Sequence, residues 1–315
     1  MKIAIASFVI SFNMIISGLE PTFANLTYTN MTKEALVASL VDLSSGIEIT
    51  GITASSHIDK CSRYYTGGHS LGFAYENDDG TTTTNVHLLP DRGIVLSSGD
   101  PEELETNNDD CTYTSWSSNL GFGALSDADL EQATGQTEPS YDACFIQFDF
   151  KCTVGSGSTV SFNYLFGSDE YTEYVDDEYN DAFAFILNGE NIAKLPSTET
   201  PTDVVSINNV NAAVNRQYFH LNDPDDPDDV YPQFEPDGFT VILTAVGTVN
   251  ETNSIKIVIA DVSDDEFDSW VLLERGTFAC GATDSSKSGK ADYSKSGKSK
   301  SKRSTKSAKN AITSY

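Results

Sequence analysis

The segment from Cys144 to Cys152 limits the fold of this chain more than any other, because apolar and polar residues alternate along it. Successive side chains of a β-strand point to opposite faces. One face of this segment reads Cys, Ile, Phe, Phe, Cys and the other is mostly polar, which predicts a half-buried strand. Such a strand places its end residues ~26 Å apart, whereas a disulfide needs Cα atoms within ~7 Å. Cys144 and Cys152 are therefore expected to pair elsewhere.

Similar patterns predict a mainly β protein. The run 160–166 is apolar or aromatic at every second position, as expected for another half-buried strand. Many short strands separated by Gly, Asn, Asp and Pro are typical of an antiparallel β-sandwich or jelly roll. We therefore expect one such domain over residues 25–283, with one or two short helices. The helices are expected at 32–42 and 126–133, further strands at 182–187, 239–246, 255–260 and 270–278, and weaker strands near 46–53 and 93–97.

Residues 1–24 have the three-part layout of a secretory signal peptide. Lys2 gives a positive start, an apolar run follows over 3–16, and Thr22-Phe23-Ala24 offers small residues for cleavage after Ala24. The alternative is a single membrane anchor, but the apolar run is shorter than the ~20 residues that a spanning helix needs. We therefore expect a secreted, extracellular or cell-wall protein that does not span a membrane after cleavage.

Two other features agree with secretion. Acceptor sequences for N-glycosylation occur at Asn25, Asn30 and Asn250. The chain also has five cysteines, at positions 61, 111, 144, 152 and 280, which is typical of an oxidising compartment. Because five is odd, at least one cysteine is free or pairs between chains, so assembly through that cysteine is one interpretation. The Cys and His spacings do not match a zinc site.

The net charge of −28 is divided unevenly along the chain. Residues 25–283 carry nine basic and 44 acidic residues, a balance of −35, which disfavours binding to nucleic acids and anionic membranes. Residues 284–315 carry nine basic residues and two Asp, and we predict that this Lys/Ser-rich tail is disordered. The tail suits a polyanionic partner: an extracellular polysaccharide, a wall or mineral surface, or the protein's own acidic body. Its candidate contact residues are Lys295, Lys298, Lys300, Lys302 and Arg303.

Acidic loops between the predicted strands form the best candidate ion site. Calcium takes about six to eight oxygen ligands, which clustered carboxylates and Asn side chains supply. The loops flank strands and could converge at one end of the sandwich, as a single cluster or as two. They do not have the spacing of an EF-hand, and the alternative is a solvated acidic surface that holds no ion. The candidate calcium ligands are Asp169, Glu170, Asn180, Asp181, Asp261, Asp264 and Asp268.

The alternative function is a secreted carbohydrate-active enzyme or esterase. The sequence 68–72 fits the G-x-S-x-G motif with Ser70 as nucleophile, but that motif needs a buried strand before it and a helix after it. Here a polar segment precedes the motif and a turn-like segment follows it. Carboxylate pairs for glycoside cleavage arise by number alone in so acidic a chain. Aromatic residues near the acidic loops would either stack on sugars or pack in the core: Tyr171, Tyr174, Tyr179 and Trp270.

Several motifs occur together in an order that resembles the choice-of-anchor L domain family. They include GIVLSSGD at 93–100, FGSDEY at 166–171, YNDAFAF at 179–185, DGFT at 237–240 and FDSWV at 267–271. The resemblance covers most of 30–280 and implies an extracellular β domain of surface proteins with differing C-terminal anchors, without known catalytic activity. The basic tail departs from that pattern and resembles Lys/Ser-rich segments of diatom wall and silica-associated proteins. We therefore expect a non-catalytic adhesive or glycan- or matrix-binding protein whose loops calcium stabilises.

Overall fold

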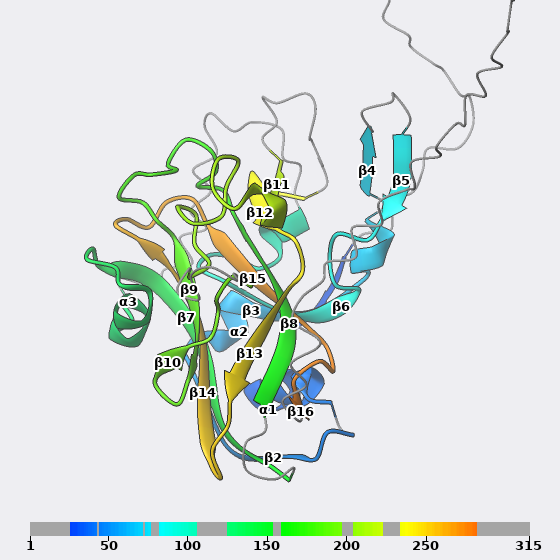
Figure 1. The fold of residues 1–315 in the computed structure, drawn as a ribbon, viewed down its shortest axis with the longest axis vertical. Coiled ribbons are helices and arrows are strands. Elements are labelled where there is room, and N and C mark those ends of the chain that lie inside the picture. Colours follow the sequence, from blue (N-terminus) through cyan, green and yellow to red (C-terminus); the bar gives the residue numbers. More distant parts are fainter. Residues whose placement is uncertain are drawn as a thin grey trace, which may run out of the picture.

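The computed structural model describes a sandwich of two β-sheets (Figure 1). The described residues are 26–42, 44–71, 73–76, 82–105, 125–153, 159–196, 204–222 and 234–281. The predicted signal peptide, the basic tail, Asn25 and Cys111 lie outside these ranges. Within them, no helix is long and apolar enough to cross a membrane.

The two large sheets are antiparallel, as predicted. The nine-stranded sheet has the order β1 (Thr27–Thr29), β3 (Ser62–Thr66), β6 (Arg92–Ser97), β15 (Ser269–Glu274), β8 (Thr159–Ser168), β12 (Gly238–Thr240) and β11 (Phe219–Leu221), with β13 (Leu243–Thr248) and β16 (Ala279–Gly281) also paired to β8. The five-stranded sheet has the order β10 (Glu190–Asn191), β9 (Ala182–Leu187), β14 (Asn253–Val262), β7 (Ser140–Cys152) and β2 (Ile47–Ala54). A separate hairpin of β4 (Phe73–Glu76) and β5 (Thr82–Val86) projects beside the sandwich (Figure 1).

Short helices occur where capping residues start them. The α1 helix (Lys33–Leu40) begins at Thr32, whose hydroxyl accepts the backbone N–H of Ala35 at 3.3 Å. The α3 helix (Ala128–Thr134) begins at Asp127 and ends at Gly135, whose φ of +75° is a conformation that glycine adopts without strain. Both predicted helices are thus confirmed. The α2 helix (Ile58–Cys61) was not predicted, because four residues are too few to show a helical period.

The alternating segment forms the centre of the five-stranded sheet. Its residues 140–152 make up β7, which pairs with β14 on one side and β2 on the other. The apolar face of β7 is buried at Ile146, Phe148 and Phe150, whereas Asp149 on the opposite face is exposed. The weaker predicted strands near 46–53 and 93–97 are confirmed as β2 and β6.

Some strands lack alternation because both of their faces are covered. The α3 helix packs on the outer face of the five-stranded sheet, where Leu130 meets Ala143, Ala184 and Val258. As a result β9 and most of β14 are buried on both faces and read as continuous apolar runs.

Two predicted strands are interrupted in the structure. The predicted strand 239–246 is divided into β12 and β13, which pair with successive parts of β8. The predicted strand 270–278 ends at Glu274, because a turn at Gly276, with φ of +72°, leads into β16. Both interruptions follow from pairing with β8, which the apolar pattern of the sequence alone does not reveal.

Aromatic side chains fill the space between the sheets, and two disulfides join them. Phe278 lies edge-on to Phe148 and Phe150, each with ring centroids 5.2 Å away. Cys144 pairs with Cys61 at the end of α2, and Cys152 pairs with Cys280 in β16. Each disulfide therefore links β7 to the nine-stranded sheet or its preceding helix. This confirms that Cys144 and Cys152 do not pair with each other.

Removing one of these links should weaken the fold. Cys152 and Cys280 are 128 residues apart, so the disulfide closes a long loop in the unfolded chain. Replacing both by Ala should lower the free energy of unfolding by about 2–4 kcal/mol, measured by urea denaturation. Cys111→Ala is the matched control, because the two disulfides leave Cys111 no cysteine partner in its own chain. An equal loss in the control, or no loss in the double variant, would contradict this account.

Candidate functional site

Five acidic residues come together at one end of the sandwich, because the strands that carry them begin or end there. Asp169 and Glu170 directly follow β8, and Asp181 directly precedes β9. Asp261 is the last residue but one of β14, and Asp268 directly precedes β15. We call these five residues the acidic cluster.

The strand registers place members of the acidic cluster side by side. The pairing of β8 with β15 brings Asp268 next to Asp169, whose backbone N–H donates to the Asp268 carbonyl at 3.2 Å. The pairing of β14 with β9 brings Asp261 next to Asp181. Both sheets therefore contribute residues to the cluster, which lies at one end of the sandwich.

All five side chains are buried, and Asp181 is the best satisfied of those whose contacts the structure gives. Its exposed fraction is 0 %, and Asp169, the most exposed of the five, reaches only 7 %. Oδ1 of Asp181 accepts the backbone N–H of Val262 at 3.0 Å, and Oδ2 accepts the Ser269 hydroxyl at 2.7 Å. These two bonds tie the start of β9 to β14 and β15.

Other carboxylate oxygens of the cluster have no hydrogen-bond partner among the residues that the structure describes. They are both side-chain oxygens of Asp261, Oε2 of Glu170 and Oδ1 of Asp169. The Ser98 hydroxyl lies near Asp261 and slightly favours its ionised form, but it makes no well-aligned hydrogen bond with it. A buried acceptor without a partner costs about 1–3 kcal/mol, and more when it is charged. The fold therefore brings together acceptors that need a donor or a cation.

The surroundings of the cluster supply negative charge rather than positive charge. Ion pairs within the described ranges involve Arg63, Arg92, Lys194 and Lys256, and none of these pairs includes Asp169, Glu170, Asp181 or Asp261. The internal segments outside the described ranges contain no Lys or Arg at all. The only basic residues without a described position are thus Lys2 and the nine in the tail.

Burial in this acidic setting raises the pKa of four of the five cluster carboxyls, those of Asp169, Glu170, Asp181 and Asp261. Burial raises the pKa of Asp181 to about 8, despite its bonds to Ser269 and Val262. Burial, and then the charge of Asp181, raises the pKa of Glu170 to about 10. Burial also holds the pKa of Asp169 and Asp261 well above the ordinary range, with neighbouring carboxylates adding to the effect. Without a cation, the cluster can stay folded near neutral pH by holding protons.

Two of the predicted calcium ligands have other contacts. Oδ1 of Asn180 accepts the backbone N–H of Asn208 at 3.0 Å and so joins two loops. Oδ1 of Asp264 accepts the backbone N–H of Glu266 at 3.2 Å, and its side chain is only partly buried. Among the described residues, no three His, Cys, Asp or Glu side chains already converge in an arrangement that would hold a metal ion. The cluster is therefore a set of neighbouring carboxylates rather than a finished coordination shell.

Two further acidic residues, which the sequence patterns did not predict as site residues, lie near Asp169. Asp237 and Glu235 are buried and add to the negative potential at Asp169. They reach the cluster because β12 pairs with the end of β8, with Gly238 opposite Ser168. The motif DGFT at 237–240 was the signal that could have pointed to Asp237.

The aromatic residues near the cluster divide into core and surface groups. Tyr171 and Trp270 are buried at 0 % and 1 % exposure, so they pack in the core and do not face a sugar. Tyr174 contacts Tyr179 and Phe267, with ring centroids 5.3 and 5.2 Å away, and all three rings are partly exposed. This trio is the aromatic surface next to the acidic loops.

Ser70 does not occupy the strand–turn–helix position of a nucleophile elbow. It lies in a 3₁₀ turn (Gly68–Ser70) between β3 and the β4 hairpin strand, and its side chain is exposed. The neighbouring His69 stacks on His87 with ring centroids 4.0 Å apart, and its Nδ1 lies 4.0 Å from an Asp91 oxygen. The local fold thus lacks the strained backbone context that the motif requires.

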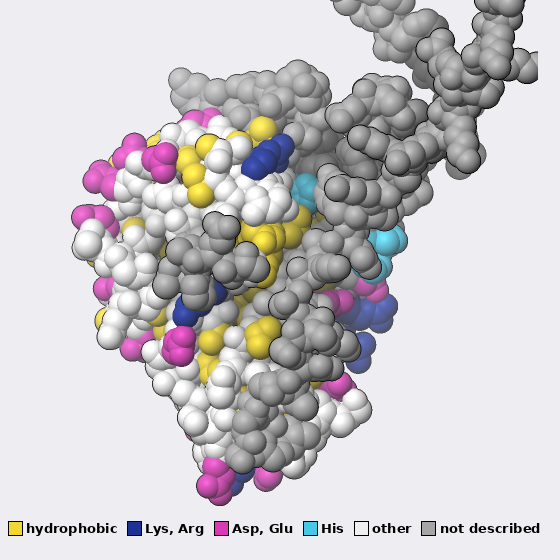
Figure 2. Space-filling view, in the orientation of Figure 1, with side chains coloured by type: hydrophobic (Ala, Val, Ile, Leu, Met, Phe, Trp, Pro, Cys, Tyr) yellow, Lys and Arg dark blue, Asp and Glu magenta, His cyan; other side chains and the backbone are white. Residues whose placement is uncertain are grey.

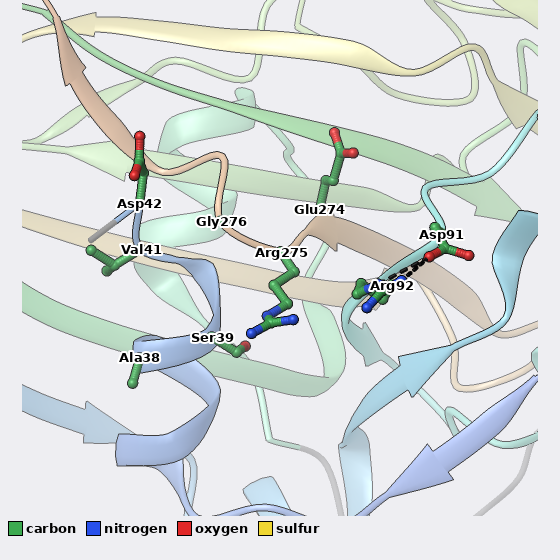
Figure 3. Close-up of a pocket in the computed structure, with 9 residues that line it drawn as sticks. All are labelled: Ala38, Ser39, Val41, Asp42, Asp91, Arg92, Glu274, Arg275 and Gly276. Carbon is green, nitrogen blue, oxygen red and sulfur yellow. Dashed lines mark hydrogen bonds and ion pairs between the residues drawn. The ribbon is translucent and has the colours of Figure 1, made fainter. Parts of the chain in front are cut away.

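A surface depression lies at the other end of β15, far along that strand from the cluster (Figure 3). It has a volume of about 460 Å³ and is open to solvent. Arg275 points across it, and Arg92 at its edge is engaged with Asp91, to which its Nε donates at 2.9 Å. The mixed charges of its rim do not indicate a particular ligand.

Two of the three predicted glycosylation sites can be examined in the structure. Asn30 and Asn250 are exposed, whereas Asn25 lies outside the described residues. Both exposed positions are in loops, beside β1 and between β13 and β14. Glycans on these residues remain a prediction of the sequence.

Comparison with known proteins gives one result. The family model described as "Choice-of-anchor L domain" matches residues 24–279, which include every strand of both sheets except the last residues of β16. Neither a search of curated proteins nor a search of solved structures gives a match.

The raised pKa values predict how the stability of the metal-free protein depends on pH. A carboxyl with a higher pKa in the folded state binds more protons when folded, so the free energy of unfolding falls as pH rises between the two pKa values. For Asp181 that interval runs from about 4, the ordinary value, to about 8. His220, whose pKa burial lowers to about 4, has the opposite effect, but only up to about pH 6.5.

The melting temperature in EDTA should therefore fall between about pH 6.5 and pH 8. Each such group contributes up to about 1.4 kcal/mol per pH unit, or a few degrees for a domain of this size. Asp181→Asn should reduce the slope, and Asp149→Asn, an exposed Asp on β7, should leave it unchanged. A melting temperature that rises or stays constant over this interval would contradict the burial of ionisable groups described here.

Proposed function

This chain belongs to the choice-of-anchor L domain family, and from that premise we propose that it is a non-catalytic matrix or wall protein that adheres to an extracellular polyanion. The family is a non-enzymatic type of surface domain, and the chain is accordingly a surface or extracellular protein. The polyanion is a sulfated or carboxylated polysaccharide, or a mineral surface that carries negative charge. The observation that carries the proposal is the separation of charge between the folded body and the tail.

The body itself is poorly suited to bind a polyanion. Figure 2 shows Asp and Glu side chains spread over the visible face, with fewer Lys and Arg among them. Several of the basic side chains are also engaged within the body: Arg63 with Glu102, Lys194 with Glu190, and Lys256 with Asp127 and Asp129. The acidic surface of the body therefore repels polyanions and disfavours their nonspecific binding to the body.

The tail has the opposite charge and a composition suited to flexible electrostatic attachment. Nine basic residues are spaced among serines over 284–315, with too few apolar residues to form a core. Such a segment binds by charge density and so tolerates many polyanions, with strong dependence on salt. In this proposal the tail attaches the protein and the sandwich stays outward from the surface.

The disulfides support an extracellular setting for this role. One joins β7 to β16 of the other sheet and one joins β7 to the end of α2, and disulfides of this kind persist in oxidising compartments. A protein that remains in a wall or matrix is exposed to proteolysis and dehydration for long periods. Covalent links between the sheets slow the opening of the sandwich under such conditions.

The proposal predicts that the tail carries the binding. Replacing Lys295, Lys298, Lys300, Lys302 and Arg303 by Gln should weaken binding of the full chain to an immobilised sulfated polysaccharide on the order of 10- to 100-fold at low salt. The reason is the loss of five charges, each of which contributes a fraction of about 1 kcal/mol. Added salt should reduce binding of the unaltered protein in the same direction.

Matched controls separate this role from general charge effects. Lys33→Gln with Lys151→Gln removes basic charge from the body and should leave binding unchanged, and a neutral polysaccharide should bind neither form. Equal binding by the tail variant and the unaltered protein would contradict the proposal. Hydrolysis of an ester that is lost in Ser70→Ala would instead favour the esterase alternative. Release of sugar that persists in Ser70→Ala would favour a glycosidase.

A further inference from the structure

We propose that the acidic cluster binds a calcium ion that locks the loop end of the sandwich, with Asp261 as the central ligand. Asp181, Asp169, Glu170 and Asp268 supply further carboxylate oxygens. The inference does not depend on polyanion binding, because it concerns the opposite charge and a different part of the chain. It rests on three observations: the burial of the cluster, the unpartnered oxygens of Asp261, Glu170 and Asp169, and the absence of an ion pair to these three from a basic residue that the structure describes.

The environment of Asp261 is the strongest evidence for the site. The exposed fraction of this residue is 1 %, and neither of its carboxylate oxygens makes a well-aligned hydrogen bond with a described residue. It is held on β14 between two flanking strands, β9 and β7, so the backbone cannot easily carry the side chain to solvent. The charged residues that act on it are acidic: Asp181, Asp268 and Asp142. A divalent cation would neutralise a buried carboxylate whose charged neighbours are also acidic.

Two other members of the cluster are also buried with an unpartnered oxygen. Glu170 is 1 % exposed and leaves Oε2 without a partner, and Asp169 leaves Oδ1 without one. The negative charge of Asp181 acts on Glu170. The negative charges of Asp237, Glu235 and Asp268 act on Asp169. The cluster thus offers four unpartnered buried oxygens, on Asp261, Glu170 and Asp169.

The carboxylates are neighbours but do not yet surround one point, so the ion draws them together by side-chain rotation. Calcium suits this requirement better than magnesium, because it accepts irregular shells of about six to eight oxygens, whereas magnesium needs a near-ideal octahedron and keeps its waters. The donors are all oxygens, which fits a hard cation and not zinc or copper. Extracellular modules bind calcium at about 10⁻⁴–10⁻³ M, a range that fits a site which fills outside the cell.

Binding here would stabilise several loops at once. Asp169 and Glu170 begin the loop between β8 and β9, Asp181 ends that loop, and Asp268 ends the loop between β14 and β15. The aromatic trio of Tyr174, Tyr179 and Phe267 lies on the same two loops. A single ion therefore fixes the ends of the segments that form this surface.

The test uses the full chain near neutral pH, with thermal unfolding in EDTA and then in millimolar calcium. The melting temperature should rise by several degrees in calcium, because the ion binds the folded state and not the unfolded one. Asp261→Asn keeps the shape of the side chain and removes its charge. In EDTA this variant should melt at the same temperature as the unaltered protein or higher, and calcium should add little or nothing.

A melting temperature that is unchanged or higher in EDTA, with the calcium response lost, identifies Asp261 as a ligand. If Asp261 only supported the fold, its replacement would lower the melting temperature both in EDTA and in calcium. Asp149→Asn is the matched control and should keep the full calcium response. If Asp261→Asn does not fold, Asp169→Asn provides the same comparison. No calcium response in the unaltered protein, or an equal response in Asp261→Asn, would overturn the proposal.

A rival occupant is the basic tail, which holds all of the unplaced basic residues but Lys2. If the tail neutralised the cluster, the five-residue Gln variant of the tail would melt at a lower temperature in EDTA, and calcium would have little effect on the unaltered protein. That result would also overturn the proposal. A calcium response that is unchanged in the tail variant would support it.

Discussion

The end of this sandwich depends on neutralising buried negative charge. Asp169, Glu170, Asp181 and Asp261 are all removed from water, and their charged neighbours are acidic. An isolated buried carboxylate is so unfavourable that it either takes up a proton or acquires a cation. In our proposal the loops at this end have two folded forms, protonated and cation-bound, and the medium decides between them. Outside a cell, where calcium is abundant, the second form would prevail.

The rest of the fold supplies stability that offsets the cost of burying these carboxylates. The core between the sheets is apolar and aromatic, and two disulfides join β7 to the opposite side. The strand β8 is central, because β15, β12, β13 and β16 all pair with it. Its end at Ser168 is also where the acidic cluster begins. The strand β8, which pairs with four others, thus positions the start of the acidic cluster, whose burial is unfavourable.

Local sequence patterns predicted most strands and helices, whereas the composition of the acidic cluster depends on pairing between distant strands. Alternation identified β7 and β8, and the predicted strand ends explain why Asp169, Asp181 and Asp261 meet. The pattern did not separate β12 from β13, since both are apolar runs and only the pairing with β8 divides them. For the same reason the contribution of Asp237 was not predicted. The roles of Asn180 as a link between loops, and of Cys61 and Cys280 as disulfide partners, depend on contacts across 28, 83 and 128 residues.

The most direct test of the central claim is a crystal structure of the full chain grown in calcium, with an anomalous difference map. The account predicts a peak at about 2.4 Å from oxygens of Asp261 and of at least two other cluster residues. It also predicts that crystals grown in EDTA lack the peak and show the same carboxylates further apart. A cluster without a peak in calcium, with its carboxyls bonded to one another or to a tail lysine, would contradict it.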